Sequence, residues 1–189
     1  MARTLSTTVD EAITTAALRL LGERGFARMS MEAIATAAGV GKPALYRRFA
    51  DKAELVASVI DGQLPALDPP DLGDTQAELW HSVQHGFPVD GPAYVALIGG
   101  LMAEHERHPE LIAAFRRSVL GPRRATVRAV IARGQARGEI RADIDATAAL
   151  DLLAGPLLAR IFAGANTGMT WREKSFATWW ELVKERNAT

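Results

Sequence analysis

Apolar residues recur along most of the chain at the spacing of an α-helix, and this pattern limits the possible folds more than any other feature. One helical face near the N-terminus carries Val9, Ile13, Ala17, Leu20 and Leu21. Another, near the C-terminus, carries Phe176, Trp179, Trp180 and Val183. No stretch of useful length alternates apolar and polar residues as a half-buried strand does. The sequence therefore predicts an all-α protein of about nine helices.

One segment interrupts the helical pattern. Residues 62–74, "GQLPALDPPDLGD", contain three prolines and two glycines, a composition that favours a break between domains. The 189 residues are enough for a small domain joined to a larger one, and 48% of them are hydrophobic, enough for a core in each. We expect a first domain over residues 1–61, a linker over 62–74 and a second domain over 75–189.

Two short predicted helices, residues 30–38 and 42–49, are separated by a turn that contains Gly39. Ser30 is placed to cap the first helix. Pro43 lies in the first turn of the second helix, where its missing N–H costs nothing. This is the arrangement of a helix-turn-helix, whose second helix enters the major groove of DNA. The second helix carries three basic residues and no acidic one, which favours DNA binding.

The same stretch permits a different interpretation, because Gly39, Gly41 and Ala44 have the spacing of a dinucleotide-binding fingerprint. That fingerprint follows a buried strand, whereas here a capped helix precedes Gly39. A phosphate-binding loop has Ser or Thr after its lysine, but Pro43 follows Lys42. A nucleotide-using enzyme is therefore disfavoured, and we predict neither catalysis nor a cofactor.

A helical protein-interaction module without DNA binding stays open as a third hypothesis. The formal net charge of the chain is zero, and residues 1–63 contain eight Lys and Arg against seven Asp and Glu. Bulk charge therefore does not indicate a nucleic-acid partner, and any basic surface must be local. Such a module would show no salt-dependent binding to DNA.

Residues 30–56, "SMEAIATAAGVGKPALYRRFADKAELV", resemble the DNA-binding half of the TetR family of transcriptional regulators. The residues that carry the resemblance are Ile34, Ala35, Ala38, Gly39, Val40, Leu45, Tyr46, Phe49, Lys52 and Leu55. The preceding helix and "GERGFARMSM" extend it to roughly residues 8–60. The resemblance implies an N-terminal three-helix helix-turn-helix domain, joined by a connecting helix to a C-terminal ligand-binding and dimerisation domain.

The resemblance also implies which residues meet DNA. Tyr46 and Lys52 are expected at phosphates, and Arg47 is suited to the edge of a guanine. The full set of candidate DNA-binding residues is Ser30, Gly41, Lys42, Pro43, Ala44, Tyr46, Arg47, Arg48 and Lys52. Gly41 departs from the family, which often has Ser or another polar residue there, so this position offers no side chain to a phosphate.

The second half of the chain is expected to form the homodimer and to bind an effector. Helix-turn-helix proteins commonly bind pseudo-palindromic sites as two-fold dimers. The apolar helices predicted over residues 146–164 and 171–186 are the expected interface. Residues 110–160 also resemble one class of TetR-family C-terminal domains. A pocket for a small hydrophobic effector is expected among Trp80, Phe87, Tyr94, Ile98, Met102 and Phe115.

The resulting hypothesis is a ligand-responsive transcriptional repressor that binds double-stranded operator DNA and is released by its effector. Cysteine is absent, and the histidine pairs His81/His85 and His105/His108 lack a complete ligand pattern, so no metal site is predicted. The N-terminus has no apolar signal segment, and no stretch is long enough to span a bilayer. We expect a soluble cytoplasmic protein with no membrane partner.

Overall fold

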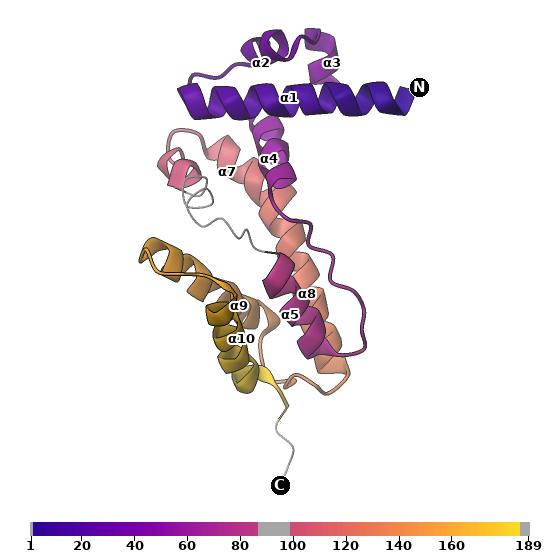
Figure 1. Cartoon of the computed structure of the whole chain (residues 1–189), viewed down its shortest axis with the longest axis vertical. Coiled ribbons are helices and arrows are strands. Elements are labelled where there is room, and N and C mark those ends of the chain that lie inside the picture. The colour runs from indigo at the N-terminus through magenta and orange to yellow at the C-terminus, as the bar shows by residue number, and fades with distance from the viewer. Residues whose placement is uncertain (1, 87–98, 186–189) are drawn as a thin grey trace. The chain divides into compact units, whose positions relative to one another are not determined.

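The computed structural model describes residues 2–86 and 99–185, which fall into two compact units (Figure 1). One unit comprises residues 1–63 and 100–120, and the other comprises residues 64–99 and 121–189. The described residues form nine α-helices and no strand, apart from one isolated bridge between Ile140 and Lys184. The predicted all-α fold is therefore confirmed. None of the described helices is both long and apolar enough to cross a membrane.

The first unit contains four N-terminal helices and a later helical pair. The four are α1 (Ala2–Arg24), α2 (Met31–Ala38), α3 (Lys42–Tyr46) and α4 (Lys52–Gln63). The pair consists of α7 (Pro109–Phe115) and the π-helix η1 (Arg116–Leu120), both of which contact α4. The buried residues of this unit include Ile13, Leu20, Phe26, Ile34, Leu45, Leu55, Ile60, Leu111 and Val119. Within each longer helix these residues recur at helical spacing, as a buried face requires.

Local hydrogen bonds set the ends of α2 and α4. Ser30 Oγ accepts the backbone N–H of Ala33 at 3.1 Å and so caps α2. Gly39 ends α2 in the left-handed conformation, with a φ of 67°. At the start of α4, Asp51 Oδ1 accepts the N–H of Glu54 at 2.8 Å. Each of these contacts joins residues only a few positions apart, so they can be predicted from the amino-acid sequence.

The helix predicted over residues 42–49 is shorter in the structure, where α3 ends at Tyr46. The N–H groups of Arg48 and Phe49 both donate to the carbonyl of Leu45, at 3.0 and 3.1 Å. The chain therefore leaves the helix through a turn that leads to α4. No glycine or proline marks this end, which is why the sequence pattern missed it.

The second unit contains α5 (Thr75–His85), α8 (Gly121–Ala136), α9 (Ala146–Phe162) and α10 (Met169–Val183). Its core includes Leu79, Val83, Val127, Ile131, Ile140, Leu150, Phe176, Trp179 and Val183. The indole Nε1 of Trp179 donates to the carbonyl of Ala149 at 2.9 Å, which joins α10 to α9. Both of these helices lie within three residues of their predicted bounds.

Residues 64–74, most of the predicted linker, form no helix but are tied to the second unit. The Arg123 guanidinium donates to the carbonyl of Pro65 at 2.8 Å, and Arg137 pairs with Asp71 at 2.7 Å. The segment is therefore held by Arg123 of α8 and by Arg137, which directly follows this helix. Since α7 and η1 belong to the first unit, the compact units differ from the predicted domains, whose boundaries stay a prediction.

Candidate nucleic-acid interface

Helices α2 and α3 follow one another beside α1 (Figure 1). Leu45 is the one residue of α3 that is fully buried. The opposite side of the helix is exposed and carries Gly41, Lys42, Pro43, Tyr46 and Arg47, which we call the α3 surface. The structure thus brings five of the predicted DNA-binding residues together. Their contact with DNA stays a prediction.

The cations of the α3 surface differ in their surroundings. Lys42 Nζ pairs with Glu32 of α2 at 3.2 Å, and both side chains are more than half exposed. The pKa of Glu32 is lowered, first by a hydrogen bond from its own backbone N–H and then by Lys42. Arg47 is exposed and forms no ion pair within the described part of the chain. Its guanidinium is therefore the cation of this surface that needs no rearrangement to meet a new partner.

Two other predicted DNA-binding residues are engaged inside the first unit. Arg48 Nε lies 2.5 Å from Asp10 Oδ1 of α1, and Arg48 Nη1 donates to the carbonyl of Ala44 at 3.0 Å. Ala44 itself is partly buried. The pair with Asp10 could not be predicted from the sequence, because Asp10 precedes Arg48 by 38 residues.

Lys52 ties the start of α4 to the loop between α1 and α2. Its Nζ donates to the carbonyls of Phe26 and Met29, at 2.9 and 3.2 Å. It also lies 4.1 Å from the centroid of the Phe26 ring, close enough for a cation–π interaction. A phosphate contact by Lys52 stays a prediction, and in the structure this ammonium group fastens the loop.

The predicted effector pocket lies only partly in the described residues. Phe87, Tyr94 and Ile98 fall outside them. The other three belong to different units: Trp80 packs on Phe176 in the second unit, with ring centroids 5.3 Å apart, whereas exposed Met102 and buried Phe115 belong to the first. The pocket stays a prediction.

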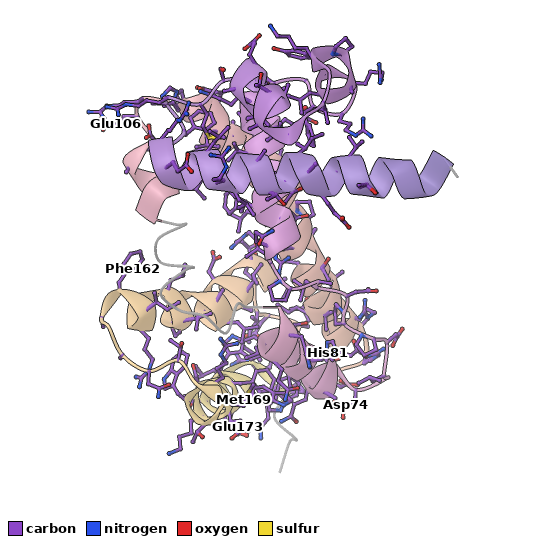
Figure 2. All side chains as sticks on the ribbon, turned by 45° about the horizontal axis from the view of Figure 1, so that its top comes forward. Asp74, His81, Glu106, Phe162, Met169 and Glu173 are labelled. Carbon is purple, nitrogen blue, oxygen red and sulfur yellow. The ribbon has the colours of Figure 1, made fainter. Side chains whose placement is uncertain are left out.

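Helix α5 carries one of the two histidine pairs whose spacing lacks a complete metal-ligand pattern. The rings of His81, labelled in Figure 2, and His85 are tilted by 32° to one another, with their centroids 4.3 Å apart. His85 Nδ1 also lies 3.0 Å from the carbonyl oxygen of His81. In the described ranges, no group of three or more His, Asp and Glu side chains is arranged to hold a metal ion.

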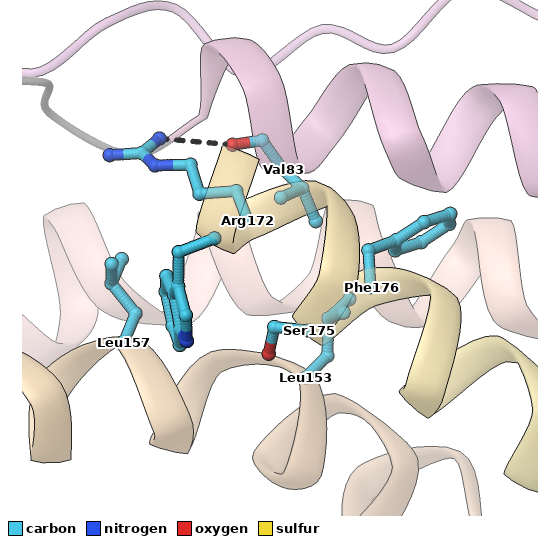
Figure 3. A pocket seen from close by; sticks show the side chains of 7 residues that line it. Val83, Leu153, Leu157, Arg172, Ser175 and Phe176 are labelled. Atoms are coloured by element: carbon cyan, nitrogen blue, oxygen red, sulfur yellow. Dashed lines mark hydrogen bonds between the residues drawn. The ribbon is translucent and has the colours of Figure 1, made fainter. Parts of the chain in front are cut away.

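The second unit contains a small cavity between α5, α9 and α10 (Figure 3). Its volume of about 20 Å³ has room for little more than one water molecule. The lining residues are Val83, Leu153, Leu157, Trp171, Arg172, Ser175 and Phe176. Arg172 is buried, and its guanidinium donates to the carbonyls of Thr167 and Val83 at 2.9 and 3.2 Å. Burial lowers the pKa of this side chain.

Arg172 was not predicted as a buried residue, although the sequence contains a signal for it. Arg172 precedes Phe176 by four residues and Trp179 by seven, which places it on the apolar stripe of α10. A basic residue at such a position is either buried with partners or interrupts the stripe. The structure shows that it is buried.

Known proteins share the sequence pattern of both halves of this chain. Residues 13–59 match the bacterial regulatory proteins of the tetR family, and residues 69–170 match the tetracyclin repressor-like C-terminal domain. The second match alone spans more than half of the chain. The chain belongs to the TetR family. As a member of the TetR family, it is a DNA-binding transcriptional regulator.

Individual relatives of this chain are also named as transcriptional regulators. An uncharacterized HTH-type transcriptional regulator of Mycobacterium tuberculosis is 31% identical over 144 residues, which are 76% of this chain and 71% of the relative. The DNA-binding transcriptional repressor TetR of Mycobacteroides abscessus is 26% identical and is matched over 83% of this chain and 84% of its own. These relatives are named as regulators, and their names indicate no catalytic activity.

Solved structures share the fold. The flavonoid-responsive regulator FrrA superimposes with a TM-score of 0.64 at 24% identity, over 95% of this chain and 98% of FrrA. A TetR-family transcriptional regulator from a Rhodococcus species superimposes with a TM-score of 0.65 at 18% identity, over 93% of this chain and 96% of its own. The TetR fold therefore extends over nearly the whole chain.

Proposed function

We propose that this protein is a repressor that acts in the cytoplasm, binds a pseudo-palindromic operator as a homodimer and is released by a small effector. The main support for the DNA-binding part of this proposal is the exposure of the α3 surface. Tyr46 is 48% exposed and Arg47 is exposed beside it, while Leu45 anchors the helix in the core. A guanidinium can donate two hydrogen bonds to one guanine, and a tyrosine hydroxyl can donate to a phosphate.

Exposed apolar residues on α9 and α10 support the homodimer. Leu152 and Phe162 of α9 and Met169 and Leu182 of α10 are all exposed in the single chain. Figure 2 shows Phe162 and Met169 near the α9–α10 connection. Large apolar side chains that stay exposed on two neighbouring helices favour a protein–protein interface. A second copy of the chain would bury them by two-fold symmetry.

The regulatory part of the proposal draws on relatives. The Mycobacteroides abscessus relative is named a transcriptional repressor, and FrrA is described as flavonoid-responsive. By analogy, we propose a repressor with a small, hydrophobic effector. Such an effector lowers operator affinity only by as much as it prefers the conformation that does not bind DNA.

The proposal is tested with a duplex that the wild-type protein selects from random-sequence DNA. Binding is measured by fluorescence anisotropy at several salt concentrations. Arg47→Ala is expected to weaken binding by about 1–3 kcal/mol, roughly 5- to 150-fold, if Arg47 pairs with a guanine. If Lys42 contacts a phosphate, Lys42→Ala is expected to weaken binding and to flatten the dependence of affinity on salt concentration.

Arg128→Ala is the matched control, because Arg128 is an exposed arginine on α8, outside the α3 surface. It should leave operator affinity unchanged. If Arg47→Ala and Lys42→Ala also leave it unchanged, α3 is not the helix that reads DNA. If the wild-type protein selects no duplex at all, the chain is a helical interaction module instead.

A further inference from the structure

Arg48 connects two helices that the sequence separates. Its Nε meets Asp10 Oδ1 in α1 at 2.5 Å, and its Nη1 donates to the carbonyl of Ala44 in α3 at 3.0 Å. The Arg48 side chain is 25% exposed, whereas the neighbouring Arg47 belongs to the exposed α3 surface. Two adjacent arginines thus have different surroundings.

Helix α3 is anchored in the core by few side chains. It has five residues, and only Leu45 among them is fully buried. One buried side chain restrains the position of a short helix more than its tilt. The Arg48 guanidinium is planar and rigid, and it joins the carboxylate of Asp10 to a carbonyl of α3. These two hydrogen bonds restrain the direction in which α3 points from α1.

We infer that Arg48 is a positioning residue, which fixes the tilt of α3 through Asp10 and does not itself contact DNA. The inference rests on the proposed binding of DNA by the α3 surface. Its partner Asp10 then contributes to operator affinity although it carries a negative charge. The exposed pair of Lys42 and Glu32 provides a contrast to the pair of Arg48 and Asp10. Substitution of Glu32 releases Lys42 and so makes a cation available to DNA.

Substitution of Asp10 distinguishes the two roles of Arg48 by the direction of the effect. If Arg48 contacts DNA, Asp10→Ala releases a cation and removes an anion, so operator binding becomes tighter or stays the same. If Arg48 positions α3, Asp10→Ala weakens binding by about fivefold or more, as Arg48→Ala does. Alanine is a good helix former, so Asp10→Ala keeps α1 intact. Glu32→Gln is the comparison variant and is expected to tighten binding.

Three further measurements complete the test with the duplex selected by the wild-type protein. The double variant Asp10→Ala/Arg48→Ala is expected to bind no more weakly than the weaker of the two single variants, because each of those already lacks the Asp10–Arg48 pair. Arg48→Lys keeps the positive charge but lacks the planar guanidinium that bonds Asp10 and the Ala44 carbonyl together. This variant should therefore bind DNA as weakly as Arg48→Ala. Arg48→Ala should also leave the slope of affinity against salt concentration unchanged, since no phosphate contact is lost.

A readout without DNA separates this inference from the proposed function. Amide hydrogen exchange of residues 45–49 in the free protein should become faster in Asp10→Ala and Arg48→Ala, but not in Arg47→Ala. Unchanged exchange in the first two variants overturns the positioning role, even if the wild-type protein binds no duplex. Tighter or unchanged DNA binding by Asp10→Ala overturns it as well.

Discussion

At the scale of single residues, Gly39 and Gly41 show how neighbouring glycines can have different roles. Gly39 has a φ of 67°, which L-amino acids with a side chain rarely adopt, and its N–H bonds to α2 carbonyls. Gly41 has a φ of −71° and a ψ of 141°, which any residue can adopt. Neither belongs to a phosphate-binding loop of the strand–loop–helix type, because helix α2, and not a strand, precedes Gly39.

We predict opposite effects when these two glycines are replaced. Gly39→Ala should lower the free energy of unfolding by about 1–2 kcal/mol, because the left-handed conformation becomes strained. Gly41→Ser should leave it unchanged or raise it by about 0.5–1 kcal/mol, since serine is a better N-cap for α3. Chemical denaturation measures both. Equal losses in the two variants would contradict the assignment.

At the scale of elements, a buried carboxylate joins α5 to α8. Glu78 is fully buried, and its oxygens accept hydrogen bonds from Arg133 and Arg137 at 2.9 Å each. The N–H of Leu72 donates to the same carboxylate at 3.0 Å. Burial alone would raise the pKa of Glu78, but these hydrogen bonds outweigh it and lower the pKa to about 2. Glu78 thus holds residues 64–74 and both helices together.

We predict that acid weakens this junction. The pKa of Glu78 is about 2 in the folded protein and 4.5 ordinarily, so the stabilising contribution is complete above pH 4.5 and is lost as the pH falls towards 2. The loss at full protonation is on the order of 3 kcal/mol. Glu78→Gln should be less stable at pH 7 and should show a flatter decline between pH 4.5 and 2, measured by urea unfolding. Parallel declines in the two proteins would count against this role.

At the scale of the whole molecule, large apolar side chains remain uncovered in the single chain. Leu152 of α9 is 59% exposed and Leu182 of α10 is 57% exposed, so neither contributes to the core of its own unit. Met102 in the first unit is 56% exposed. The three side chains are therefore exposed to a similar degree, but only Leu152 and Leu182 lie on the proposed homodimer interface.

We predict that Leu182→Glu or Leu152→Glu dissociates the homodimer, because each places a charge in an apolar interface. Met102→Glu is the matched control and should remain dimeric. Sedimentation equilibrium measures the mass, and circular dichroism checks that helix content is kept. A dimer that survives both Leu182→Glu and Leu152→Glu would place the interface elsewhere. Operator affinity should fall with the dimer, since a monomer contacts only one half-site.

Much of the fold follows from interactions between residues that are close in sequence. The period of apolar residues predicts the helices, and Ser30 and Gly39 mark the two ends of α2. The helix-turn-helix could be predicted for the same reason, since its turn and caps are local. The exposed positions of Tyr46 and Arg47 then follow from the inward position of Leu45.

Only the tertiary structure decided which charged residues that are far apart in the sequence pair with one another. Arg48 meets an aspartate 38 residues away, and Glu78 meets Arg133 after 55 residues. No local pattern records such pairs, because they depend on how helices pack. By itself, therefore, the sequence determined most of the helices, the caps of α2 and the helix that is proposed to read DNA. Packing decided that Arg48 is held by α1, since only the folded chain brings Asp10 within hydrogen-bonding distance of it.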